Sequence, residues 1–332
     1  MRREDRPALT PEVLRLDCGA EVERIAAGMI RIVGERLRRR GAIVALSGGV
    51  DSSVCAALAV HAFGPKKVFG LHLPERESSA SSTTRARQVA EQLGIPCETE
   101  DISATLEAIG CYRRRDEAIR RVFPEYDEQW KSKITIAGGT EGRINFFKLV
   151  VESPDGQISA ARLPLREYLQ IVAATNYKQR IRKAVEYFHA DRLHYAVLGT
   201  PNRLEYDQGF FVKNGDGAAD FKPIAHLYKS QVYALARHFR LPEEICDASP
   251  TTDVYTMRQN QDEFYFALPY DKMDIALWAH DHAVPANELA ICLGTDEKHA
   301  RFIYRDIENK RAATRYLHAR AALIDRLSEI DD

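Results

Sequence analysis

The segment that most constrains the fold runs from Ile43 to Gly64 and reads IVALSGGVDSSVCAALAVHAFG. Ile43 to Leu46 are strand-forming residues without a polar interruption, which is typical of a central parallel strand covered on both faces. From Ser52 to Phe63, apolar residues separated by alanines favour a helix that packs on a sheet. The segment therefore predicts a buried strand and a helix joined by a short glycine-rich turn.

The turn between the two elements has the properties of an anion site. Gly48 and Gly49 permit backbone conformations that are closed to other residues. They also let a ligand approach the N–H groups at the helix N-terminus, where the helix dipole favours negative charge. Three hydroxyl donors lie beside them, from Ser47, Ser52 and Ser53. We therefore expect a nucleotide phosphate here; the simpler alternative is an ordinary link in which Asp51 or a serine caps the helix.

The turn also points to a particular ATP chemistry. No Gly-Lys-Ser/Thr follows it, so it is not a Walker A loop, and it lacks G-x-G-x-x-G. The string Ser-Gly-Gly-Val-Asp-Ser-Ser resembles the signature of the ATP pyrophosphatases, which cleave ATP between the α and β phosphates and adenylate a substrate. The resemblance implies that ATP is bound by Ala45, Leu46, Ser47, Gly48, Gly49, Val50, Asp51 and Ser52.

Composition narrows the possible function classes. The chain has 332 residues, enough for one elaborated α/β domain or two smaller ones. Its 47 Lys and Arg balance 48 Asp and Glu to a net charge of −1, which argues against a nucleic-acid-binding surface. The 6 cysteines are dispersed without a Cys-x-x-Cys pair, so no zinc or iron–sulfur site is expected. With no signal peptide and no membrane-spanning apolar run, we expect a cytoplasmic protein without membrane contact.

Strand and helix patterns alternate along most of the chain. We expect strands over 43–46, 68–73, 97–102 and 195–199 and helices over 12–40, 52–63, 85–93 and 228–239. This alternation predicts an α/β fold with a doubly wound parallel sheet flanked by helices. In such a sheet the phosphate turn lies at the carboxyl edge.

The alternation stops between Cys111 and Tyr168. Two strand-like runs, 144–151 and 157–163, flank Ser-Pro-Asp-Gly, a sequence that reverses the chain. We expect a β-hairpin within an insertion at about 112–168. The insertion would belong to a single domain over 1–332 that ends in a helical segment at about 271–332. No glutaminase domain is expected, because too few residues precede the strand at Ile43.

Two later stretches resemble the ammonia-dependent NAD synthetase family. Val197–Ala236 contains Gly-Thr, a Glu five residues after that Thr, then G-F-F-x-K, G-D-G-x-x-D and a Lys before the next helix, all at the family's spacing. Pro250-Thr-Thr-Asp253 matches the family's Pro-Thr-x-Asp. Asn176–Arg182 is similar to its Asn-x-x-x-Arg-x-Arg. The match runs from about Val44 to Lys310, interrupted by the insertion.

The resemblance implies an AMP-forming ligase that amidates deamido-NAD to NAD through an acyl-adenylate, using ammonia. Asp51 and Glu205 would hold Mg²⁺, because hard cations take carboxylate oxygens. Lys229 would neutralise the β and γ phosphates, and Thr200 and Thr251 would contact ATP. The catalytic residues implied are Asp51, Glu205, Lys229 and Asp220, and the deamido-NAD contacts are Arg180, Lys213, Asp220, Asn309 and Lys310. A homodimer is also implied, with ammonia taken free or from a separate glutaminase.

Two other functions stay open at this point. Pro201 and Asn309 depart from residues common in the family, and the insertion adds a further difference. These departures leave room for a paralogous ATP-pyrophosphatase amide ligase that acts on a different carboxylic acid. The second alternative is a nucleic-acid-binding module, since residues 284–310, with Gly294 between two helical patterns, could form a helix-turn-helix.

Overall fold

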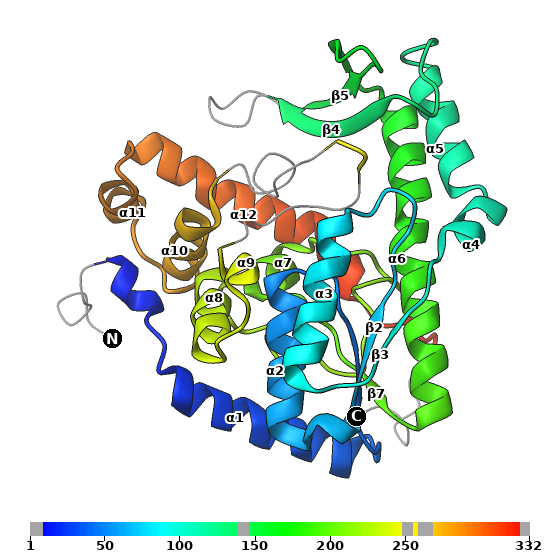
Figure 1. The fold of residues 1–332 in the computed structure, drawn as a ribbon. Helices are drawn as coiled ribbons and strands as arrows, with labels where there is room; N and C mark the ends of the chain where they lie inside the picture. Colours follow the sequence, from blue (N-terminus) through cyan, green and yellow to red (C-terminus); the bar gives the residue numbers. More distant parts are fainter. Residues whose placement is uncertain (1–8, 138–145, 248–254, 258–267, 326–332) are drawn as a thin grey trace.

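Four short parallel strands form the central sheet in the order β3-β2-β1-β7 (Figure 1). The computed structural model describes residues 9–137, 146–247, 255–257 and 268–325. The strands are β1 (Ala42–Ala45), β2 (Val68–His72), β3 (Cys97–Thr99) and β7 (Ala196–Val197). Since β1 pairs in parallel with β2 on one side and β7 on the other, it is central in the sheet, as its uninterrupted apolar sequence predicts.

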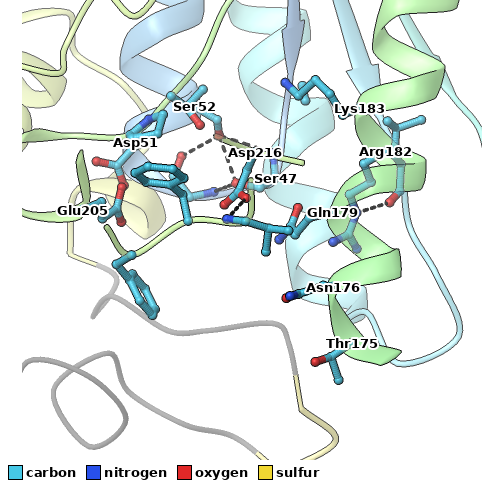
Figure 2. A pocket seen from close by; sticks show the side chains of 18 of the residues that line it. Ser47, Asp51, Ser52, Thr175, Asn176, Gln179, Arg182, Lys183, Glu205 and Asp216 are labelled. Carbon is cyan, nitrogen blue, oxygen red and sulfur yellow. Dashed lines mark hydrogen bonds between the residues drawn. The ribbon is translucent and has the colours of Figure 1, made fainter. Parts of the chain in front are cut away.

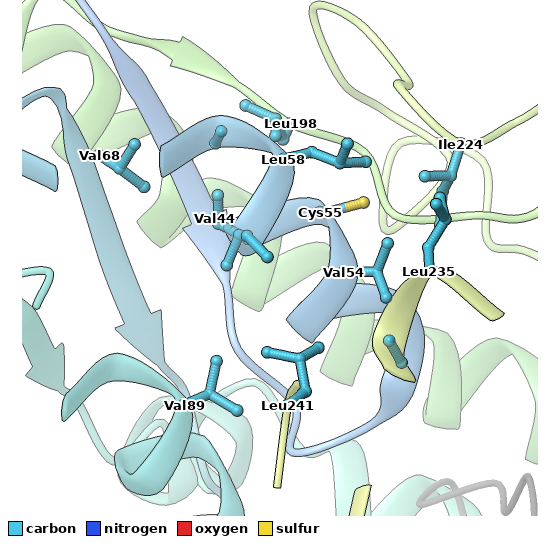
Figure 3. Close-up of a cluster of buried hydrophobic side chains, with 14 of the residues drawn as sticks. Val44, Val54, Cys55, Leu58, Val68, Val89, Leu198, Ile224, Leu235 and Leu241 are labelled. Atoms are coloured by element: carbon cyan, nitrogen blue, oxygen red, sulfur yellow. The ribbon is translucent and has the colours of Figure 1, made fainter. Parts of the chain in front are cut away.

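Helices cover both faces of this sheet. Ala42 and Val44 of β1 face a core that also contains apolar residues of α1 (Cys18–Ile30), α2 (Val50–Phe63), α3 (Ala80–Leu93) and α8 (Lys229–His238). Figure 3 shows this core around Val44, Leu58 and Leu235. Ile43 points to the opposite face, against the long helix α6 (Leu165–Leu193). The predicted doubly wound α/β fold is confirmed.

Local capping explains where the helix boundaries differ from those predicted. The pattern over 12–40 is not one helix but a 3₁₀ turn (Pro11–Leu14), α1, and a π-helical segment (Arg31–Arg36). Helix α1 begins at Cys18 because the Asp17 carboxylate accepts a hydrogen bond from the Ala20 N–H at 3.1 Å. Helix α3 begins earlier than predicted, because Ser79 caps it by accepting from the Ser82 N–H.

The insertion forms a three-stranded antiparallel sheet rather than a hairpin alone. The predicted hairpin is present as β5 (Phe146–Glu152) and β6 (Ile158–Arg162), and β4 (Lys131–Ala137) adds to it. One face packs on α5 (Cys111–Arg120) and the start of α6. Figure 1 shows β4 and β5 beside that end of the two helices. The buried residues at this contact include Ala118, Ile119, Ile134, Leu149, Val151 and Ile171.

The predicted C-terminal helical segment consists of α10 (Tyr270–Asp281), α11 (Ala286–Leu293) and α12 (Glu297–His318). Gly294 ends α11 at φ 67°, so the turn between α11 and α12 forms where it was expected. Helix α12 packs on α7 (Arg203–Gln208), where the Arg311 guanidinium binds the Asp207 carboxylate through two bonds of 2.7 Å. Short helices α4 (Ser103–Ala108) and α9 (Glu243–Cys246) and a 3₁₀ turn (Pro65–Lys67) complete the described elements. Among the described helices, none combines the length and apolarity that a membrane span requires.

Candidate active site

The turn after β1 is fixed by hydrogen bonds and by one close contact. Gly48 has φ 77°, and a Cβ at this position would lie 2.5 Å from the Ser82 carbonyl oxygen. Arg85, from the same helix as Ser82, also binds this peptide, because its Nε donates to the Gly48 carbonyl at 2.8 Å. Ser52 and Ser53 donate to the Gly49 carbonyl at 3.1 and 2.8 Å. The turn can therefore tolerate only glycine at position 48.

A buried polar cluster surrounds the Asp51 carboxylate at the start of α2. Asn202 Nδ2 donates to Asp51 at 2.9 Å, and Lys229 Nζ forms a close ion pair with the other carboxylate oxygen. The Lys229 side chain is 4% exposed and that of Asp51 is 17% exposed. Burial lowers the pKa of Lys229, but the attraction of Asp51 and Glu205 outweighs it and raises the pKa overall. Lys229 therefore stays protonated.

Asn202 connects Asp51 to Glu205. It caps α7, with its side-chain oxygen accepting from the Glu205 N–H at 3.2 Å while Glu205 accepts from the Asn202 N–H at 3.2 Å. This is a capping box, Asn-x-x-Glu, that could be found in the sequence but was missed. Figure 2 shows Asp51 and Glu205 side by side. Two carboxylates held in this way, beside a phosphate-binding turn, are a suitable donor set for a hard divalent cation.

The turn and the cluster line one cavity of about 780 Å³. Helix α6 lines it with residues from Tyr168 to Glu186, a span of about 27 Å at 1.5 Å per residue. Figure 2 shows Asn176 and Gln179 on this side of the cavity. The Glu186 end is the sheet end, because the neighbouring part of α6 packs on β1 and β7. The Tyr168 end is the insertion end.

A second group of charges, missed in the sequence, lines the cavity where α6 meets the G-D-G segment. Lys183 and Glu186 are both buried and form an ion pair at 2.6 Å. Asp216 accepts from the Val212 N–H at 2.7 Å and also lines the cavity. Burial raises the pKa of both Glu186 and Asp216. These groups can interact with the polar parts of a substrate that lies along α6.

Most residues expected to contact ATP, and one of those expected to contact the acid, line this cavity. They are Ala45, Leu46, Ser47, Gly48, Gly49, Val50, Asp51, Ser52, Thr200, Glu205, Lys229 and Lys310. Lys310 comes from α12, where it pairs with Asp306 at 2.6 Å. Burial lowers the pKa of Lys310, and Asp306 opposes that shift. Thr251 lies outside the described residues.

Four residues expected at the acid site do not line the cavity. Arg180 donates to the Lys213 carbonyl at 3.3 Å, and Lys213 Nζ donates to the Tyr316 and Ala319 carbonyls at 2.8 and 2.9 Å. Asp220 accepts from the Val197 N–H at 2.7 Å and from the Tyr187 hydroxyl at 3.3 Å. Asn309 is exposed on α12. Their role in substrate binding stays a prediction.

One further supporting residue, Asp274 of α10, was missed because nothing nearby in the sequence marks it. It is fully buried, and its carboxylate accepts from the N–H groups of Lys229 and Ser230 at 3.2 and 2.7 Å. These are the first two residues of α8, whose N–H groups have no partner within the helix. Asp274 therefore caps the helix that presents Lys229 to Asp51.

Comparison with known proteins agrees with this geometry. The NAD synthase family matches residues 21–123 and 148–315. The "NH(3)-dependent NAD(+) synthetase" of Rhizobium meliloti is 52% identical over 99% of this chain and 98% of its own length. The protein of the same name from Mesorhizobium japonicum is 53% identical over 96% of this chain and 100% of its own.

A solved structure shows that the fold is shared as well. The "NH3-dependent NAD synthetase" of Campylobacter jejuni superposes with a TM-score of 0.61 over 94% of this chain and 100% of that chain, at 20% identity. Such a distant match speaks for the fold alone, while the sequence matches extend over the turn, α7 and α8, where the polar cluster lies. The family predicted from the motifs is therefore confirmed, and this chain belongs to the NAD synthase family.

Proposed function

We propose that the chain is an ammonia-dependent ligase that converts deamido-NAD to NAD at the expense of ATP. The observation that carries this proposal is the single cavity in which the Ser-Gly-Gly turn meets Asp51, Glu205 and Lys229. Relatives at 52 and 53% identity share one enzyme name, so a paralogous ligase for another acid is not favoured. A nucleic-acid-binding module is not favoured either, since α12 turns Lys310 and Thr314 toward the cavity.

The reaction has two steps in this cavity. An oxygen of the substrate carboxylate attacks the α-phosphorus of ATP, and the bond from that phosphorus to the bridging oxygen breaks, so pyrophosphate leaves. Ammonia then attacks the acyl carbon of the adenylate, loses a proton, and expels AMP. The N–H groups of the turn bind phosphate oxygens, and Lys229 supplies positive charge beside them. The protein contributes positioning and charge neutralisation rather than a covalent intermediate.

Mg²⁺ is part of the proposal, with Asp51 and Glu205 as its protein ligands. Both carboxylates already meet at Asn202, and both contribute to the raised pKa of Lys229. The cation would neutralise phosphate charge during attack at the α-phosphorus. A carboxylate has about four lone-pair sites, so Asp51 could bind the cation while it still holds Asn202 and Lys229.

The assembly and the nitrogen source belong to the same proposal. We expect a homodimer, and the exposed apolar side chains of Leu165, Leu169 and Phe188 on α6 offer surface for one. Ammonia would be used free or delivered by a separate glutaminase. A cytoplasmic location fits six cysteines that are all described and all without a disulfide.

The proposal is tested by product analysis. Purified protein is incubated with ATP, Mg²⁺, deamido-NAD and ammonium, and nucleotides are separated by chromatography. We expect NAD, AMP and pyrophosphate in equal amounts, no ADP, and no NAD when glutamine replaces ammonium. Release of ADP, or turnover of another carboxylic acid but not deamido-NAD, would contradict the proposal. Sedimentation at working concentration tests the dimer separately.

A further inference from the structure

The inserted sheet contributes side chains to the cavity as well as to the fold. Ile136 of β4 and Phe147 of β5 line it, together with Tyr168 at the start of α6. Ile136 and Phe147 are paired directly across the two strands, so they lie on one face of the sheet. Residues 124–147, which include both, fall outside the family match. Two of these three residues are aromatic and the third is apolar, and we call the set the aromatic wall.

The aromatic wall is held rigidly. The next pairs on the same face of the sheet, Ile134 with Leu149 and Ser132 with Val151, are buried in the contact with α5 and α6. Phe147 stacks on Tyr168 with ring centres 4.1 Å apart and 12° between the planes. A wall fixed in this way loses little conformational entropy when a ligand packs on it.

Besides the packing on α5 and α6 and the Phe147–Tyr168 stack, hydrogen bonds hold the edge of β4 that does not pair with β5. The Ser132 N–H donates to Thr256 Oγ1 at 2.6 Å, the Thr256 hydroxyl donates to the Ser132 carbonyl at 3.3 Å, and the Met257 N–H donates to that carbonyl at 3.2 Å. Tyr255, in the same short segment, is buried in the core under the sheet and also lines the cavity. The inserted sheet is therefore held beside the cavity by three sets of contacts: with α5 and α6, with Tyr168, and with residues 255–257.

The two ends of the cavity differ in chemistry. The sheet end carries the phosphate-binding turn and the charged groups Asp51, Lys229 and Lys183. The insertion end carries Ile136, Phe147, Tyr168 and Val172, which offer apolar and aromatic surface. A nucleotide has the same polarity along its length, because the phosphates are charged and the base is a flat aromatic ring that stacks on aromatic side chains.

We propose that the inserted sheet completes the nucleotide site, with the adenine ring of a bound substrate packing on the aromatic wall. This inference rests on the proposed function, in which both ATP and deamido-NAD carry an adenine ring. The wall is a specificity element that binds the base, and it leaves the bond-making atoms to the turn and to Lys229. Its removal weakens binding equally before and during reaction, so KM rises while kcat stays nearly constant.

The test is equilibrium binding, which needs no turnover. Titration calorimetry measures the affinities of α,β-methylene-ATP, which cannot be cleaved between those phosphates, of deamido-NAD, and of inorganic tripolyphosphate, which has no base. In Phe147→Leu the ring is lost and apolar volume is largely kept. We expect roughly 10-fold weaker binding of the ligand whose adenine meets the wall, with tripolyphosphate unchanged. Phe147→Tyr, which keeps the ring, should bind almost like the unmodified protein.

The control is Thr135→Ala, the neighbour of Ile136 on the opposite face of β4. It should bind all three ligands normally. A loss confined to the ATP analogue assigns the wall to ATP, and a loss confined to deamido-NAD assigns it to the dinucleotide. Unchanged affinities in a folded Phe147→Leu, or an equal loss for tripolyphosphate, overturn the inference. Because binding is measured without reaction, failure of the amidation assay and failure of this inference are distinguishable.

Discussion

At the sheet end of the cavity, the turn is held by its own neighbours, with Ser52 and Ser53 bonded to Gly49 four or fewer residues away. At the insertion end, Ile136 and Phe147 reach the cavity only because β4 pairs with β5 and Thr256 binds the edge of β4. The backbone of the turn is therefore set mainly by local bonds, to which Arg85 and Lys229 add contacts from distant segments, whereas the aromatic wall depends entirely on contacts between distant segments. Substitutions of the charged groups at the first should therefore affect chemistry most, and those at the second affinity and local stability.

The largest effect is expected from the carboxylates at the sheet end. Asp51→Asn removes charge from the cluster and leaves the buried Lys229 ammonium without its ion-pair partner. Glu205→Gln keeps the cap of α7, because glutamine at this position can also accept from the Asn202 N–H. We expect each variant to lower kcat/KM about 100-fold or more, the order found when one charge-stabilising group is removed from an active site.

These two variants have a matched control at the same edge of the sheet. Asp101→Asn changes an exposed carboxylate that binds the Ser103 N–H at 2.7 Å and does not line the cavity. It should retain normal steady-state kinetics. Near-normal kcat/KM in Asp51→Asn or Glu205→Gln at saturating Mg²⁺ would contradict the roles proposed for these carboxylates.

The next effect distinguishes backbone strain from close contact in the turn. Gly48 and Gly64 have nearly the same φ, 77° and 78°, but a Cβ at Gly48 would meet the Ser82 carbonyl whereas one at Gly64 would meet nothing within 4 Å. Gly64→Ala should lower the free energy of unfolding by about 1–3 kcal/mol, the cost of strain alone. Gly48→Ala should lower the free energy of unfolding by more than this. It should also weaken ATP binding, because α3 must move away from the new Cβ.

Urea unfolding and titration of the ATP analogue measure both quantities. If the two alanine variants unfold at the same urea concentration and bind the analogue equally well, then the contact between Gly48 and α3 contributes neither to stability nor to ATP binding. The turn would in that case be less rigid than its hydrogen bonds indicate.

A smaller effect is expected at the insertion end. Thr256→Val removes the hydroxyl that accepts from the buried Ser132 N–H. An unpaired buried donor costs about 1–3 kcal/mol, so the melting temperature should fall while kcat changes little. Thr135→Val, the same substitution on the other side of β4, is the control and should melt normally. A fall in kcat with normal melting would mean that the segment acts on the chemistry directly.

Local sequence was sufficient for the turn at the sheet end, but not for the support of Lys229 or for the insertion end. The strand, the turn and α2 could be predicted because their apolar pattern and glycines act within one short segment, and Glu205 could be placed by motif spacing. Strand β4 could not, because Lys131–Ala137 becomes a strand through pairing with β5.

Asp274 lies on a helix far along the chain from Lys229, and no local pattern relates the two. Arg180, Lys213 and Asp220 match the family by spacing, yet their side chains bind backbone groups outside the cavity wall, a relation that spacing does not specify.

The last effect is expected at Asp274, and it appears only as a change of stability with pH. Burial raises the pKa of this carboxyl to about 7, and hydrogen bonds from Ser230 and Lys229 and the Lys229 charge only partly oppose the shift. A raised folded-state pKa means that the group's contribution to stability is complete below about pH 4, its ordinary pKa, and is lost as pH rises to about 7.

Asp274→Asn does not titrate. Its free energy of unfolding should therefore decline less than that of the unmodified protein between pH 4 and 7, even though asparagine caps α8 less well. Asp271→Asn, on the exposed side of the same helix, should keep the original slope. Parallel curves for Asp274→Asn and the unmodified protein across this range would show that Asp274 is ionised throughout and acts on Lys229 only as a fixed cap.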